Sequence, residues 1–170
     1  MQRPQEGEYN PYFQRYIDLV ADGDYLELLK QNTTKAINSF RNIAAEKHNY
    51  AYAEGKWTIK EMLMHIIDTE RVMSYRALVA ARGDSNSLLC SMDENAYALS
   101  ANVTNRTMDD LLEEFNAVRT ATEKLYQHLS EEQCKQRANI VNYPTSARAL
   151  GYIIIGHVEH HINVLNERYL

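Results

Sequence analysis

The amino-acid sequence predicts an all-α protein built as a four-helix bundle. Four long segments of the 170-residue chain repeat apolar residues at every third or fourth position, which is typical of helices with one buried face. No segment sustains the apolar–polar alternation of a half-buried β-strand. We therefore expect a single domain, residues 1–170, in which residues 1–22 form an extension with a short helix around Tyr12 to Val20.

Helix-start signals mark the first two long helices. Asp24 can cap a helix whose apolar positions continue to about Lys47, where we expect it to end. Thr58 and Glu61 have the spacing of a capping box, in which the two side chains bind the free backbone N–H groups of a helix start. The second helix should run from there to about Arg82, because Gly83 and a polar stretch follow.

The third and fourth helices are separated from the second by a long connection. Thr107 can cap the third helix, and the fourth should begin near Pro144 and continue to the C-terminus. The connection 83–106 is longer than a plain turn between bundle helices. It could shape a site, contain a short helix around 93–99, or be a disordered crossover.

The charge balance and the cysteines limit the kinds of partner and compartment. A formal net charge of −5 offers no broad basic surface, so we expect no nucleic-acid binding. Cys90 and Cys134 lack CxxC spacing, which favours free thiols in a reducing compartment. The N-terminus has no apolar signal-peptide region, and no run reaches the ~18 apolar residues of a membrane span. We expect a soluble, cytoplasmic protein with no membrane partner.

Three histidines are the candidate metal ligands. His157 and His161 lie four residues apart within the apolar stripe of the fourth helix, so their Cβ atoms should be about 5–6 Å apart and both rings can reach one ion. This pair alone could equally be two hydrogen-bonded core histidines. His65, on the flank of the stripe of the second helix, is a candidate third ligand. Three buried imidazoles would each need a polar partner in an apolar core, whereas one metal ion binds all three.

The ligand set limits the choice of metal. Three neutral nitrogen ligands suit Zn²⁺ or Ni²⁺, with Fe²⁺, Co²⁺ and Mn²⁺ as alternatives, and they leave a coordination position open. His160 should lie about 80° from the centre of the stripe, on the solvent side or behind a ligand. His48 and His128 fall at helix ends, where the helix dipole favours such a group.

Two carboxylates follow His65 on the same helix. Asp68, one turn later, is a candidate general base, but it could instead orient a ligand histidine or be a solvated acid on the helix face. Glu70 falls within the apolar stripe, where an unpaired carboxylate is costly. We therefore expect a structural ion pair for Glu70, with Arg71, Arg76 or a tyrosine as its partner, in preference to a catalytic role.

Two motifs together resemble the DinB/YfiT-like family of metalloproteins. The first is the segment Trp57-Thr-Ile-Lys-Glu-Met-Leu-Met-His65, which continues to Asp68 and Arg71, and the second is Gly156-His157-Val-Glu-His160-His161. The opening Arg3-Pro4 and Glu8-Tyr9-Asn-Pro11-Tyr12 also look like the start of the YfiT branch. The resemblance covers nearly the whole chain, and neither motif is specific without the other.

This resemblance implies a fold, a ligand set and two types of activity. The expected fold is an up-down-down-up four-helix bundle, often dimeric, in which 83–106 is the crossover between the second and third helices. A divalent metal would be bound by His65, His157 and His161. The activities implied are metal-dependent hydrolysis and the transfer of a low-molecular-weight thiol, such as bacillithiol or mycothiol, to a small-molecule electrophile. The alternative is a non-catalytic bundle in which the metal stabilises the fold or a homodimer.

Overall fold

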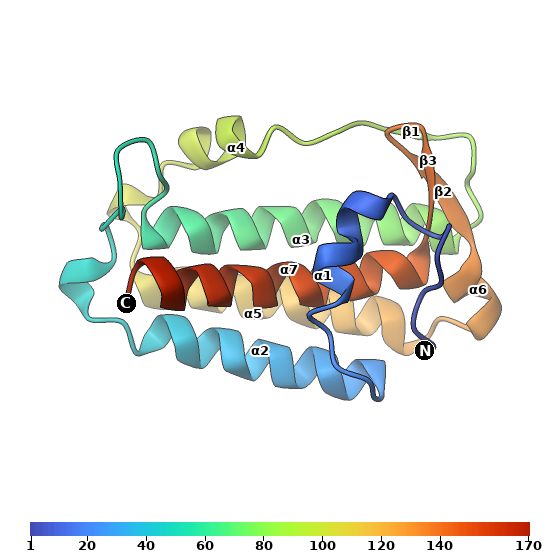
Figure 1. Ribbon diagram of the computed structural model, residues 1–170, viewed down its shortest axis with the longest axis horizontal. Helices are drawn as coiled ribbons and strands as arrows, with labels where there is room; N and C mark the ends of the chain where they lie inside the picture. Colours follow the sequence, from blue (N-terminus) through green and yellow to red (C-terminus); the bar gives the residue numbers. More distant parts are fainter.

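The computed structural model describes all 170 residues and contains the four long helices of the expected bundle (Figure 1). They are α2 (Tyr25–Arg41), α3 (Ile59–Ala81), α5 (Met108–Gln127) and α7 (Ala147–Arg168). Helices α2 and α7 run in one direction along the bundle, and α3 and α5 run in the other (Figure 1). The topology is therefore up-down-down-up, and the chain must travel back along the bundle between the parallel helices α3 and α5. No helix combines the length and hydrophobicity that a membrane crossing requires.

The predicted caps start three of these helices. The Asp24 carboxylate accepts hydrogen bonds from two backbone N–H groups of α2. Thr58 and Glu61 form the complete capping box of α3, and Thr107 caps α5. The predicted end of α2 at Lys47 is wrong, because the helix stops at Arg41 and a separate 3₁₀ turn, Ala45–Lys47, follows. Residues beyond the helix still pack on the core, so the apolar spacing continues past the point where the helix ends.

A small three-stranded sheet closes one end of the bundle. Its strands are β1 (Leu88–Leu89), β2 (Arg137–Ile140) and β3 (Tyr143–Ser146). β1 pairs with β2 in parallel, and β2 pairs with β3 as an antiparallel hairpin. A short helix, α6 (Glu131–Lys135), precedes the hairpin. The class is thus mostly helical, with a minor sheet that the sequence analysis did not predict.

The hairpin places the start of the fourth helix at the end of the predicted stretch 144–146. Pro144 lies in β3 opposite Asn139, and α7 begins only after Ser146, whose side chain accepts a hydrogen bond from a backbone N–H of the first turn. The two residues of the hairpin loop, Val141 and Asn142, both have positive φ angles, of 49° and 62°. Such a loop suits the twist of a two-stranded hairpin, but Val-Asn is not one of its common sequences.

The connection 83–106 forms an ordered crossover over α3. It contains β1, the helix α4 (Glu94–Ala101) and a 3₁₀ turn, Val103–Asn105, so the alternative of a short helix around 93–99 is the one that the structure contains. At its far end, Lys60 Nζ donates to the carbonyl oxygens of Thr104 and Arg106 at 2.6 and 3.0 Å. Because β1 pairs with β2 at the other end, the crossover is fixed at both ends and α4 lies between them (Figure 1).

A polar layer divides the core of the bundle into two apolar clusters. One cluster lies toward the sheet and the other toward the opposite end. Between them each long helix contributes a buried polar residue, namely Asn32, Glu70, Arg119 and His157. Arg119 Nε donates to the Glu70 carboxylate at 3.1 Å, and Arg119 Nη1 donates to Asn32 Oδ1 at 2.9 Å. The structural ion pair of Glu70 is confirmed, but its partner is Arg119 of α5 and none of the expected residues.

The N-terminal segment packs on α7 at a glycine. A 3₁₀ turn, Pro11–Phe13, leads into α1 (Gln14–Ile17), which lies against α7. A Cβ atom at Gly156 would lie 1.9 Å from the carbonyl oxygen of Tyr16, so only glycine fits at this close approach. The contact also brings the Tyr16 ring to 5.5 Å, centroid to centroid, from the ring of His157.

Replacing Gly156 by alanine is expected to displace α1 and to lower the free energy of unfolding by about 1–3 kcal/mol, because the added methyl group overlaps backbone that cannot move locally. Thermal denaturation and limited proteolysis of the N-terminal segment measure the two effects. Gly151→Ala is the matched control on the same helix. Its Cβ would meet only side-chain atoms, of Tyr25 and Tyr126 at 2.9–3.1 Å, so this variant should leave α1 in place. Equal melting temperatures and equal protease protection for the two variants would contradict the expectation.

Candidate metal centre

Three buried histidines converge at the interface of α3 and α7. His65 comes from α3, His157 and His161 come from α7, and their exposed fractions are 3, 6 and 8 %. The Nε2 atom of His157 lies 3.0 Å from Nε2 of His65 and 3.1 Å from Nε2 of His161. The structure thus brings together all three residues that the sequence analysis named as metal ligands, within 4.8 Å of one another.

Local structure explains this convergence. His157 and His161 are one turn apart on α7, so their rings lie on the same face of the helix. Helix α7 runs antiparallel to α3, which places His65, in the second turn of α3, beside the C-terminal half of α7. The indole of Trp57, just before the capping box, covers the His65 ring at a centroid distance of 4.5 Å.

The geometry fits a bound cation better than hydrogen bonds among the rings. A neutral Nε2 atom has either one N–H or one in-plane lone pair, so the central Nε2 of His157 can form a good hydrogen bond with only one of its two neighbours. A cation can accept lone pairs from all three nitrogens. Nitrogen ligands about 2.0–2.1 Å from a tetrahedral ion lie roughly 3.3 Å apart, so the two separations that His157 Nε2 makes need to change by only a few tenths of an ångström.

Burial keeps these imidazoles uncharged at neutral pH. It lowers the pKa of His65 to about 4, with a smaller electrostatic contribution from His160. Burial and the neighbouring imidazoles lower the pKa of His157 and His161 well below the ordinary value. Neutral imidazoles have the free lone pairs that metal binding requires.

The Nδ1 atoms of His65 and His161 have few hydrogen-bond partners. Thr69 Oγ1 lies 3.5 Å from Nδ1 of His65, and Nδ1 of His161 is buried without a partner. His160 is half-buried, and its ring packs against those of Tyr16 and His161 at 5.4 and 5.1 Å. His160 therefore lies behind the candidate ligand His161, which is one of its two expected positions.

Asp68 does not lie with the three histidines. Its carboxylate is 3.6 Å from the Arg71 guanidinium, and no hydrogen bond connects it to His65, His157 or His161. Burial raises its pKa. A residue three positions after His65 is turned about 60° from it around the helix, whereas Thr69, at four positions, is turned only about 40° to the other side and lies over the same face. Thr69 was not named in the sequence analysis, although this spacing could have identified it.

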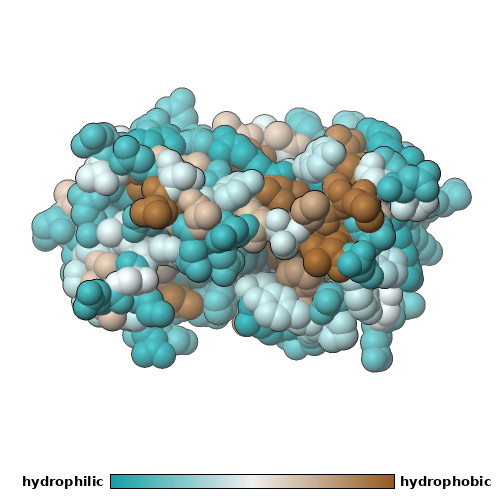
Figure 2. Space-filling view, turned by 90° about the horizontal axis from the view of Figure 1, so that it is seen from above, coloured by the Kyte–Doolittle hydropathy of each residue, from teal (hydrophilic) through white to brown (hydrophobic).

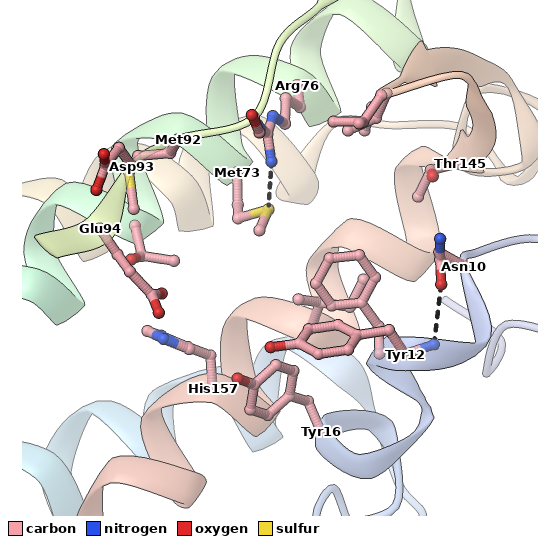
Figure 3. Close-up of a pocket in the computed structure, with 16 residues that line it drawn as sticks. Asn10, Tyr12, Tyr16, Met73, Arg76, Met92, Asp93, Glu94, Thr145 and His157 are labelled. Carbon is pink, nitrogen blue, oxygen red and sulfur yellow. Dashed lines mark hydrogen bonds between the residues drawn. The ribbon is translucent and has the colours of Figure 1, made fainter.

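A cavity of about 450 Å³ opens beside His157, toward the sheet end of the bundle (Figure 3). Its walls come from the N-terminal segment, α3, the crossover, the hairpin and α7. Thr69, Met73 and Arg76 continue the face of α3 that begins at His65, because they follow it at helical spacing. Hydrophobic residues gather around a hollow toward the sheet end in the view from the crossover side (Figure 2).

Glu94, the first residue of α4, is the acid that faces the histidines in this cavity. Its carboxylate points toward the His157 ring (Figure 3). The sequence analysis missed this residue, because the path of the crossover determines where Glu94 lies and no local pattern reveals that path.

A second cavity, of about 250 Å³, lies on the other side of the cluster. Its lining includes Lys56, Trp57, Asn95, His160 and His161. Glu94 lines the first cavity and Asn95 the second, so the first turn of α4 separates them. The histidine cluster can therefore be approached from two sides.

Comparisons with known proteins give a consistent result. The model of the DinB superfamily matches residues 26–165. A candidate metal-dependent hydrolase of Oceanobacillus iheyensis is 23% identical over 140 residues, which cover 82% of this chain and 80% of that protein. YfiT from Bacillus subtilis, described as a candidate metal-dependent hydrolase with an unusual four-helix bundle topology, superposes with a TM-score of 0.73 at 15% identity, covering 98% of this chain and 90% of YfiT.

A second solved structure shares the fold over part of its length. The mycothiol-dependent maleylpyruvate isomerase superposes with a TM-score of 0.67 at 13% identity. The match covers 82% of this chain but only 58% of the isomerase. At this identity the likeness shows the fold alone.

Proposed function

Because the chain belongs to the DinB superfamily, we propose that it is a metal-dependent hydrolase that acts on a small molecule and binds a divalent metal ion through His65, His157 and His161. One observation supports this above all: three buried imidazole nitrogens converge at the wall of a cavity of about 450 Å³. The hydrolase descriptions of the relatives from O. iheyensis and B. subtilis agree with it.

The ligand set favours Zn²⁺ or Ni²⁺, with Fe²⁺, Co²⁺ or Mn²⁺ as alternatives. His65, His157 and His161 would hold the ion, which would lower the pKa of a water molecule toward neutrality and polarise a carbonyl group. The rings of Trp57 and Tyr16 pack against the rings of His65 and His157 at centroid distances of 4.5 and 5.5 Å. Glu94, which points toward His157 from the cavity side, is placed to accept the proton of an attacking water molecule.

Replacing Glu94 by glutamine is expected to lower kcat about 100-fold while the chain still binds its metal, because the amide cannot accept the proton. A screen of ester and amide substrates on the metal-loaded protein would identify a usable substrate, and kcat and metal content would then be measured for each variant. Asp68→Asn is the matched control, since Asp68 pairs with Arg71 and should leave kcat nearly unchanged. If Asp68→Asn gave the large loss and Glu94→Gln did not, the base would be Asp68.

The second cavity favours a second candidate function, the transfer of a low-molecular-weight thiol. A two-substrate reaction needs room for both molecules at the metal, and the cluster has a cavity on each side. Incubating the metal-loaded protein with 1-chloro-2,4-dinitrobenzene, with and without bacillithiol, would test it. Formation of the thiol adduct faster than without protein supports transfer, whereas ester or amide turnover without any thiol supports hydrolysis. Metal binding with no turnover in either assay favours the non-catalytic bundle.

A further inference from the structure

One buried arginine in the large cavity has no acidic partner. Three arginines are at least nine-tenths buried: Arg76, Arg119 and Arg148, with exposed fractions of 5, 2 and 3 %. Arg119 pairs with Glu70 and Arg148 pairs with Glu8. Arg76 donates only to the carbonyl oxygen of Cys90, at 2.5 Å, and to the Met73 sulfur, at 3.6 Å. No carboxylate lies within 4.0 Å of its guanidinium.

An unpaired guanidinium is costly to bury and points to a missing anion. Burial lowers the pKa of Arg76, yet an arginine remains charged in proteins. A carbonyl oxygen and a thioether are neutral acceptors, so they leave the positive charge uncompensated. The guanidinium is directed into the cavity beside Met73 (Figure 3), where a ligand can reach it.

The two acids that line the same cavity are engaged elsewhere. The Asp93 carboxylate caps α4 by accepting from the backbone N–H of Ala96 at 3.0 Å. The Glu94 carboxylate points toward His157 (Figure 3). With two carboxylates and a single arginine lining the same cavity, a monoanion is favoured over a phosphate dianion. The planar guanidinium matches the two oxygens of a carboxylate.

The position of Arg76 sets the shape of the ligand. Arg76 follows His65 by eleven residues on the same face of α3, which is about 16 Å along the helix axis. Between the two ends, the wall includes Tyr12, Met73 and Ile153. A ligand that spans the cavity would have its anionic end at Arg76, an apolar body along this wall and its other end at the histidines.

We propose that Arg76 is the carboxylate-binding residue of the cavity and that the substrate is an organic monocarboxylate with an apolar body, whose reacting group lies at His157. The placement of the reacting group rests on the proposed metal-dependent function. The binding of the carboxylate by Arg76 does not, and it can be measured on protein without metal.

Calorimetric titration of chelator-treated protein with 4-phenylbutyrate, and separately with the neutral 4-phenylbutyramide, tests the proposal. Removing the metal excludes direct binding of the carboxylate to an ion. The wild type is expected to bind the acid at least about tenfold more tightly than the amide. Arg76→Met should remove this preference, Arg76→Lys should weaken it because the planar fork is lost, and Arg82→Met, at an exposed arginine of the same helix end, should keep it.

The melting temperatures of the variants show whether Arg76 is merely structural. Since its charge has no partner, Arg76→Met should melt no lower than the wild type. Equal affinity for acid and amide, no binding of the acid by the wild type, or an unchanged preference in Arg76→Met would each overturn the proposal. Metal content is measured separately. If the protein binds no metal but still prefers the acid, and this preference requires Arg76, only the proposed metal-dependent function is refuted.

Discussion

Alanine in place of His157 is expected to abolish metal binding. Its Nε2 atom is the one that lies within about 3 Å of both other ligand nitrogens, so its loss leaves two ligands on different helices. For the wild type, metal at a thousandfold excess over its Kd should stabilise the fold by about 4 kcal/mol. In a chain of this length that raises Tm by roughly 8–16 °C. The variant should show no such rise.

The measurements are metal content per chain after dialysis and Tm with and without added Zn²⁺ or Ni²⁺. His160→Ala is the matched control, because this histidine adjoins the candidate ligand His161 on α7 but lies outside the converging cluster. It should retain both the metal and the rise in Tm. A wild type that gains no stability from any of the divalent metals would refute the metal site, as would stoichiometric metal in His157→Ala.

Methionine in place of Arg119 is expected to lower the free energy of unfolding by about 3–5 kcal/mol, because it leaves the Glu70 carboxylate buried without its partner. Both side chains are only 2 % exposed, so water cannot replace the lost ion pair. Asn32 Oδ1 also loses its donor. Equilibrium unfolding in urea measures the change.

Two further variants separate a buried pair from a surface pair. The double variant Glu70→Leu with Arg119→Met should recover most of the lost stability, since it removes both charges from the core. Arg71→Met removes a half-exposed partner of Glu114 and should cost less than about 1 kcal/mol. A loss in Arg119→Met no larger than that in Arg71→Met would contradict the expectation.

The helices were predictable because their start signals are local. Thr58 with Glu61 forms the expected capping box, and Asp24 and Thr107 cap the expected helices. The up-down-down-up arrangement of the helices was predicted from the resemblance of two motifs to a family. The hairpin was missed because its strands have four residues each, too few to show alternation, and because the positive φ of Val141 is imposed by its surroundings.

The candidate site was predictable only where helical spacing determines it. His157 and His161 share a face of one helix, and His65 was found on the flank of the apolar stripe of another. The predicted partner of Glu70 was wrong because Arg119, the actual partner, comes from a different helix and is distant in sequence. Glu94 reaches the cavity through the path of the crossover, and that path depends on pairing at both ends of the connection.

The N-terminal segment forms part of the cavity wall but lies outside the range that the family model matches. The family model matches residues 26–165, and these contain the three histidines. Tyr12 and Tyr16, which line the cavity, lie before that range on a segment that packs onto α7 at Gly156. Mutations in this N-terminal segment can therefore change the wall of the cavity while the three histidines stay as they are. Part of the cavity wall can thus evolve independently of the three histidines, while the rest of it, including Met73 and Arg76 of α3, lies within the matched range.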